Sequence, residues 1–169
     1  MGEGRTERQR TYFDEPRFRD VLRQFATGIT VVTGRDVERR PRAVTVNSFA
    51  SVSLDPPLVL YCLGRSAFNF DVFAKAKAFA INILSADQQA LSDRFAREAE
   101  DELADLELTE LETGSPVLSG CLAVLDCETE KIHEAGDHLI IVGRVAALDL
   151  SRESDPLIYF RSRYRNLKS

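Results

Sequence analysis

The stretch AVTVNSFASVSLDPPLVLYCL, residues 43–63, carries two kinds of β-strand signal on either side of a turn. In 43–54, small apolar and polar residues alternate except at Ser48 and Phe49, which break the pattern, and this predicts a strand with one buried and one wet face. In 58–63 every side chain is apolar, which predicts a central strand buried on both faces. An aspartate and two prolines at 55–57 separate the two strands, because proline cannot donate to a β-ladder. The stretch therefore predicts consecutive strands of a β-rich core.

The alternating half of this stretch presents polar side chains along one face. The apolar face carries Val44, Val46, Ala50, Val52 and Leu54, and the opposite face carries Thr45, Asn47, Ser51 and Ser53. This pattern has two interpretations. The polar face either meets water, as in most antiparallel sheets, or lines a groove where small donors and acceptors meet the polar edge of a planar ligand, with Phe49 as the apolar member.

The chain of 169 residues has the length and composition of one domain. Hydrophobic residues make up 44% and charged residues 29%, which excludes the disordered and fibrous classes. No apolar run reaches the roughly 18 residues that span a membrane, so a cytoplasmic protein without a membrane partner is expected.

A net charge of −5 argues against nucleic acid as a partner. Cys62, Cys121 and Cys127 lack metal-binding spacing and are expected to act as small hydrophobes, so no metal site is expected.

Signals along the rest of the chain are mostly those of strands. Helices are expected at 14–27, 66–73 and 85–95, and strands at 29–33, 79–84, 121–132 and 139–150. Asp14, Ser66 and Ser85 are the expected N-caps, Gly143 predicts a β-bulge, and the acidic segment 98–112 is expected to be a solvated face or loop. These elements predict a mainly β fold, a closed or split β-barrel with a few flanking helices.

The motifs of several large enzyme classes are absent from the sequence. There is no glycine-rich dinucleotide or phosphate loop, no zinc-protease helix motif and no serine-hydrolase elbow, and His133 and His138 are the only histidines. Gly64, Arg65 and Ser66 form either an anion site before a helix or an ordinary helix start. The turn before His138 is either a plain hairpin or a device that holds a histidine against an aromatic cofactor ring.

Seven ordered blocks resemble the short-chain flavin reductases, which supply reduced flavin to two-component monooxygenases. The blocks are FATGITVVT, TVNSFASVSLDPPLVLYCL, RSAFNFDVF, FAINIL, GSPVLSG, GDHLIIVGRV and PLIYFRSRY, and they lie between residues 18 and 167. The resemblance implies an FMN-binding split β-barrel of antiparallel Greek-key strands, a homodimer, and reduction of FMN or FAD by NADH or NADPH. It also implies one domain over residues 14–169, after a flexible arm at 1–13.

The resemblance also assigns residues to the two cofactors. The flavin-binding residues that it implies are Thr45, Val46, Asn47, Ser48, Phe49, Ser51, Val52, Ser53, Cys62, Leu63, Arg65, Ser66 and Asn69. The nicotinamide-binding residues that it implies are Gly136, Asp137 and His138, and His138 is the expected catalytic residue. The family usually has a glycine-containing segment where this chain has Pro41, Arg42 and Ala43, so Arg42 is a candidate for a positive charge near the ligand.

The implied reaction is direct hydride transfer from nicotinamide to flavin. It requires two stacked rings and the exclusion of water more than it requires a proton donor, which fits a chain with two histidines. Backbone N–H groups and hydroxyls within 47–53 are expected to stabilise negative charge on the reduced ring. The alternative is a flavin-binding electron carrier or sensor on the same barrel. A relative of the pyridoxine-phosphate oxidases is a third interpretation, although the basic phosphate cluster of that class is not evident here.

Overall fold

The computed structural model describes residues 13–97, 103–151 and 153–167, so the expected arm at 1–13 lies almost wholly outside the described residues. The helices of the described chain are α1 (Glu15–Leu22), α2 (Phe70–Phe73) and α3 (Gln89–Phe95), with a 3-10 turn η1 (Ala86–Gln88) before α3. Its strands are β1 (Thr27–Gly28), β2 (Thr30–Arg35), β3 (Pro41–Val46), β4 (Ala50–Leu54), β5 (Pro57–Gly64), β6 (Ala78–Ile83), β7 (Leu108–Glu110), β8 (Pro116–Leu118), β9 (Ala123–Ala135), β10 (His138–Leu150), β11 (Ile158–Phe160) and β12 (Arg163–Arg165).

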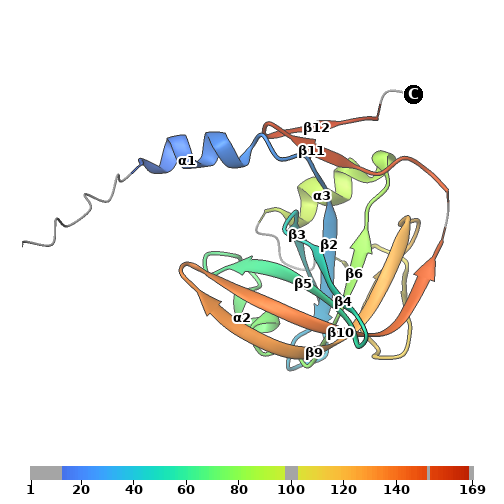
Figure 1. Cartoon of the computed structure of the whole chain (residues 1–169). Helices are drawn as coiled ribbons and strands as arrows, with labels where there is room; N and C mark the ends of the chain where they lie inside the picture. Colours follow the sequence, from blue (N-terminus) through green and yellow to red (C-terminus); the bar gives the residue numbers. More distant parts are fainter. Residues whose placement is uncertain (1–12, 98–102, 152, 168–169) are drawn as a thin grey trace, which may run out of the picture.

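The main sheet is antiparallel, has the order β3-β2-β6-β9-β10-β5-β4, and curls into a barrel (Figure 1). Strands β3 and β4 lie at opposite edges of this sheet, although only residues 47–49 separate them in sequence. The chain therefore crosses from one edge to the other at 47–49, and the barrel is split there instead of being closed by a ladder. This arrangement confirms the predicted mainly β, split-barrel fold.

The face alternation predicted for 43–54 is not reproduced by the burial of these residues. Strand β3 is an edge strand that pairs with β2 and buries only Ala43 and Val46, whereas β4 is an exposed edge strand beside β5. On β4, Val52 is 48% and Leu54 95% exposed, so the prediction that both belong to a buried face was wrong. The crossing at 47–49 and the register shift between Ser51 and Ser53 both interrupt the side-chain parity, because a strand's faces keep their parity only while its ladder is continuous.

Strand β5 is buried on one face and half-buried on the other. Val59, Tyr61 and Leu63 point into the barrel, and β5 lies between β10 and the edge strand β4. The predicted central strand, buried on both faces, is therefore corrected to a strand next to the edge. Its outer residues, Leu58, Leu60 and Cys62, are only partly covered.

Two of the three expected helix starts are confirmed. Asp14 accepts a hydrogen bond from the backbone N–H of Arg17 at 2.9 Å, and Ser85 with Gln88 forms a capping box. Ser66 is not a cap, because α2 begins only at Phe70 and has Asn69 at its N-cap. The first helix ends at Leu22, and Gly28 lies in β1 instead of ending the helix.

The expected acidic loop at 98–112 is partly structured. Residues 98–102 lie outside the described part, but Leu103 is 3% exposed in the core and β7 pairs with β8. One predicted irregularity is confirmed at Gly143, where the register between β9 and β10 shifts. None of the helices in the described segments is long and apolar enough to cross a membrane.

Candidate functional site

A cavity of about 220 Å³ opens at the split between the two edges of the barrel. Its walls come from the end of β3, from residues that follow it, from the end of β5 and from the start of β10. The lining residues are Val44, Thr45, Val46, Asn47, Ser48, Cys62, Leu63, Gly64, Ala67 and His138. We call this the seam cavity. Seven of these residues are ones that the sequence assigns to cofactor binding, and Val44, Gly64 and Ala67 are additions.

Ser48 links residues 47–49 to β5 across the split, beside the seam cavity. Its Oγ accepts from the backbone N–H of Cys62 at 2.9 Å and donates to the carbonyl of Cys62 at 3.0 Å. Both hydrogen bonds replace ladder bonds that β3 and β5 cannot form across the split. The Ser48 hydroxyl is thus occupied within the protein, and its role is to hold residues 47–49 in place.

Thr45 is also held by the protein, on the side that faces α3. Its hydroxyl donates to the carbonyl of Ser92 at 2.8 Å, and the Ser92 hydroxyl lies 2.9 Å from the Tyr164 hydroxyl, which donates to Asp93 at 3.0 Å. Burial raises the pKa of Tyr164, with Asp93 adding to the increase. The C-terminal hairpin and α3 therefore fix the position of β3 along the cavity wall.

Asn47 is the polar side chain of the seam cavity that remains available. It is exposed, and its amide forms no side-chain hydrogen bond with any residue in the described part of the chain. Residues 47–49 also lie beyond the last pair of the β2–β3 ladder and before the first pair of the β4–β5 ladder. Their backbone N–H groups are consequently not taken up by a ladder, which suits binding of a polar ligand edge.

His138 lies at the mouth of the seam cavity, where β10 pairs with the end of β5. It is opposite Gly64 in the ladder, and a Cβ built on Gly64 would come within 3.3 Å of the His138 Nε2. Glycine at 64 therefore leaves the space that the imidazole ring occupies. The sequence had singled out Gly64 for close approach to a phosphate, whereas in the structure its nearest neighbour is this ring.

Asp137 orients the His138 ring from the adjoining turn. Its Oδ1 lies 2.7 Å from His138 Nδ1, and this hydrogen bond, reinforced by the charge of the imidazolium form, lowers the pKa of Asp137. The Asp137 carbonyl accepts from the backbone N–H of Arg65 at 2.9 Å, and Gly136 takes the turn's positive φ of 62°. With Nδ1 held by a carboxylate, the ring directs its other nitrogen, Nε2, toward Gly64.

The other predicted site residues lie outside the walls of the seam cavity. Ser51, Val52 and Ser53 lie on β4, Phe49 packs against the core, and Arg65 and Ser66 are exposed beyond the end of β5. Asn69 is 7% exposed, and its Nδ2 donates to the carbonyl of Ala43 at 2.7 Å. Its amide supports β3, a role that a motif does not reveal.

Arg65 and Arg42 differ from their expected surroundings. Arg65 lies 3.5 Å from Glu134 and over the Phe70 ring, so its charge is partly balanced. Arg42 pairs with Asp36 at the opposite end of β3 and does not line the seam cavity, which corrects the expectation of a positive charge there.

The composition of the seam cavity fits a planar heteroaromatic cofactor such as flavin. Its apolar wall consists of Val44, Val46, Leu63 and Ala67, and no lining residue is acidic. The unpaired amide of Asn47 and the ladder-free backbone at 47–49 supply polar contacts along one edge. Polar and apolar groups share the lining of this cavity, a combination that suits a planar ring with a polar edge. This antiparallel barrel, split at one seam with a cavity in the split, has the architecture of the split barrels, the class in which the sequence resemblance placed the chain.

Comparison with known proteins gives the family. The model of the flavin reductase like domain family matches residues 22–168, and the chain belongs to this family. It is 39% identical over 155 residues, 92% of this chain and 79% of the relative, to the flavin-dependent monooxygenase reductase subunit HsaB of Rhodococcus jostii. It is 47% identical over 142 residues, 84% of this chain and 80% of the relative, to the FMN reductase (NADH) SmoA of Agrobacterium fabrum.

A solved structure agrees with the fold. The NADH:FAD oxidoreductase SgcE6 of Streptomyces globisporus, in complex with NAD and FAD fragments, superposes with a TM-score of 0.85 at 33% identity. The match covers 92% of this chain and 93% of that one. The two folds therefore agree along nearly the whole length of both chains.

Proposed function

We propose that this chain is an NAD(P)H:flavin oxidoreductase that reduces FMN or FAD by direct hydride transfer and supplies reduced flavin to a flavin-dependent monooxygenase. The observation that carries the proposal is the seam cavity. The Asn47 amide lines it without a partner among the described residues, and the His138 ring packs against Gly64 at its mouth. The names of the relatives, which include an FMN reductase (NADH) and a monooxygenase reductase subunit, support the same reaction.

The positions of the residues support the roles that we propose for them. Val44, Val46 and Leu63 form a wall for the flavin ring, and Asn47 with the backbone of residues 47–49 donates to its polar edge. The bound flavin supplies the hydride acceptor. Donors fixed before the reaction stabilise negative charge more effectively than mobile water does. Ser48 and Thr45 hold these donors in place through their bonds to Cys62 and Ser92.

His138 is the proposed nicotinamide platform. Its side chain is 47% exposed, so one surface of the ring is open to a ligand. The flat ring positions the nicotinamide against the wall that holds the flavin and keeps water from the space between them, which is the main requirement of hydride transfer. Asp137 and Gly136 shape the turn that carries it, and the remaining predicted residues of β4 and the 65–69 segment extend the flavin site beyond the seam cavity.

A homodimer is part of the proposal. Helix α1 projects from the barrel beside β11 and β12 (Figure 1), and it has no buried residue. Its large apolar side chains, and those beside it, are exposed: Phe13, Phe18, Val21, Leu22 and Phe25. A helix of 8 residues is not stable in water without a packing partner. A second copy of the chain supplies that partner, and sedimentation of the full chain should give twice the mass of 18.9 kDa.

The test of the activity is anaerobic mixing of the full chain with each pair of NADH or NADPH and FMN or FAD. We expect loss of the visible absorbance of oxidised flavin with at least one pair, and no loss with any pair would overturn the proposal. Flavin binding without reduction would instead indicate an electron carrier or sensor. Because nicotinamides and free flavins are cytoplasmic metabolites, the proposed site of action is the cytoplasm.

His138→Ala tests the proposed platform. We expect flavin reduction to slow about tenfold or more, while flavin affinity changes less than about threefold, because the ring positions the donor and not the acceptor. His133→Ala is the matched control, since His133 is exposed on β9 and does not line the seam cavity. Equal loss of flavin binding and reduction in His138→Ala would contradict the assignment.

A further inference from the structure

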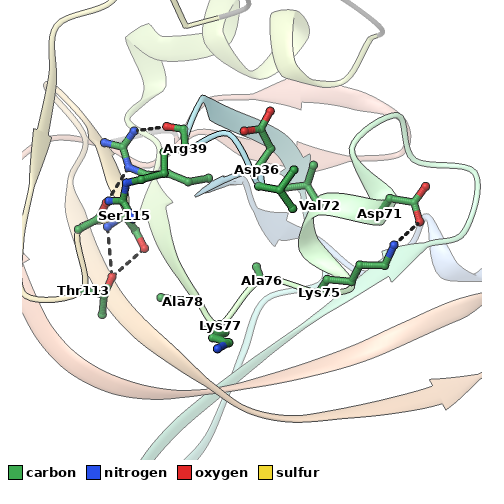
Figure 2. A pocket seen from close by; sticks show the side chains of 13 residues that line it. Asp36, Arg39, Asp71, Val72, Lys75, Ala76, Lys77, Ala78, Thr113 and Ser115 are labelled. Atoms are coloured by element: carbon green, nitrogen blue, oxygen red, sulfur yellow. Dashed lines mark hydrogen bonds and ion pairs between the residues drawn. The ribbon is translucent and has the colours of Figure 1, made fainter.

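A second and larger cavity lies at the other end of β3. Its volume is about 600 Å³, and it shares no residue with the seam cavity. Figure 2 shows its walls: the β2–β3 hairpin with Asp36 and Arg39 on one side, Lys75 to Ala78 opposite, and Thr113 and Ser115 at one end. Nothing in the proposed hydride transfer uses this cavity, which we call the hairpin cavity.

The side chains around the hairpin cavity carry more positive than negative charge. Four are cationic, Arg35, Arg39, Lys75 and Lys77, and two are acidic, Asp36 and Asp71. The cations therefore outnumber the acids that line this cavity, although the whole chain carries −5 and Glu112 and Glu128 line an adjoining cavity together with Lys77. A local excess of positive charge lined by low-dielectric walls attracts small anions.

Two of the four cations are neutralised within the protein. Arg35 pairs with Glu110 and also donates to the carbonyls of Gly114 at 2.9 Å and Arg39 at 2.8 Å. Lys75 lies 3.7 Å from Asp71 on α2. The contacts of Arg35 link the hairpin to the 110–114 segment, and the unpaired positive charge of the cavity remains on Arg39 and Lys77 among the described residues.

The acidic Asp36 does not offset the remaining cations. Its carboxylate points away from the strip Lys75 to Ala78 in Figure 2 and accepts from Arg40 at 2.9 Å and from Arg42 at 3.1 Å. Burial alone would raise the pKa of Asp36, but hydrogen bonds from Arg40 and Arg42 and from the backbone lower it to about 2. Asp36 is thus a permanent anion that is already saturated with donors.

Arg39 and Lys77 remain as the cations without a partner. Neither the Arg39 guanidinium nor the Lys77 ammonium has an ion pair or hydrogen bond with any residue in the described ranges. Arg39 reaches across the end of the cavity, since a Cβ on Gly114 would lie 3.9 Å from its Nη2. Within the described part of the chain, both groups therefore keep their donors free, Arg39 on the hairpin wall and Lys77 on the wall opposite.

The backbone holds Arg39 in an unfavourable conformation. Its φ is 62°, a left-handed value that costs an arginine more than a glycine. The conformation is kept by the Arg39 N–H bond to the Asp36 carbonyl at 2.9 Å and by the Arg35 bond to the Arg39 carbonyl. Strained residues that the surroundings hold firmly are concentrated at binding sites.

The floor of the hairpin cavity is apolar. Val72, Ala76 and Ala78 line it, and Val37 on the hairpin is 96% exposed at its edge. We propose that the hairpin cavity binds a small organic anion, with its carboxylate or phosphate between Arg39 and Lys77 and its apolar body over this floor. The volume lies within the usual range of small-molecule sites.

The test measures binding of benzoate and phenyl phosphate to the full chain by calorimetry at low salt, with benzamide and inorganic phosphate as probes that lack the charge or the apolar body. We expect saturable binding of at least one of the two organic anions, weaker binding of both controls, and loss of affinity as salt is added. Arg39→Gly and Lys77→Met should each weaken binding about tenfold.

Matched variants separate loss of the site from loss of the fold. Lys131→Met removes a lysine on β9 that does not line the cavity and should bind like the unaltered chain. Arg39→Gly relieves the positive φ, so it should melt no lower than the unaltered chain and reduce flavin at the same rate. The proposal is overturned if neither organic anion binds, if benzamide or inorganic phosphate binds equally well, or if Arg39→Gly and Lys77→Met bind like Lys131→Met.

Discussion

Replacing Gly64 by alanine tests whether the packing of the His138 ring against residue 64 positions the ring for catalysis. The added Cβ would lie 3.3 Å from His138 Nε2, which is tighter than most Cβ contacts in proteins, and at ordinary contact distance, 3.7 Å, from Cδ2 and Cε1. The imidazole must move outward by a few tenths of an ångström. Because the His138 side chain is 47% exposed, it has room to do so, and we expect the free energy of unfolding to fall by less than about 1 kcal/mol.

The expected effect on catalysis is much larger than the effect on stability. Hydride transfer depends steeply on ring placement, and an error of about 1 Å costs roughly a hundredfold, so a shift of part of that distance should slow flavin reduction about tenfold. Stopped-flow mixing with nicotinamide under anaerobic conditions measures this rate, and a flavin titration measures affinity, which should change little. Gly28→Ala is the control, since its Cβ would meet nothing within 4 Å.

A double variant makes the test specific. In a His138→Ala background, Gly64→Ala should have no further effect on the reduction rate, because the group that the Cβ displaces is gone. The reasoning is refuted if Gly64→Ala alone reduces flavin at the unaltered rate, or if it slows reduction equally with and without His138.

The remaining predictions concern the barrel interior. The Tyr61 hydroxyl is buried, has no partner among the described residues, and has a pKa raised by burial. Tyr61→Phe should therefore raise the free energy of unfolding, measured by urea denaturation, by up to about 1 kcal/mol. A lower free energy of unfolding would contradict this, because it would mean that the hydroxyl has a hydrogen-bond partner. A Cβ on Gly143 would lie 2.5 Å from the buried Phe79 ring. Gly143→Ala should therefore lower the free energy of unfolding by at least about 2 kcal/mol. An unchanged thermal midpoint would show that this contact relaxes freely.

Local signals predicted several elements correctly because the cause lay within a few residues. The caps at Asp14 and Ser85 depend on a side chain and a backbone N–H three residues away, and both formed. The bulge at Gly143 was also predicted, because a glycine within a strand leaves room for one. Ser66 failed as a cap because the following residues, 66–69, form turns before α2 begins.

Non-local contacts caused the other errors. The sequence pattern gave no sign that β3 and β4 lie at opposite sheet edges, so the parity assigned to Val52 and Leu54 was wrong. It also gave no sign that the Asn69 amide would be used to support Ala43. Both outcomes depend on contacts between residues that are distant in sequence, and periodicity carries no information about them.

The sequence by itself determined the mainly β class through strand periodicity, and the family resemblance carried by an ordered set of motifs implied seven of the ten residues that line the seam cavity. The tertiary structure alone decided which polar groups remain available. Ser48 and Thr45 are bound within the protein, while Asn47 and one surface of His138 stay open. The physical reason is that a hydroxyl serves the fold or a ligand according to which acceptor the chain brings within reach, and only the folded barrel fixes those distances.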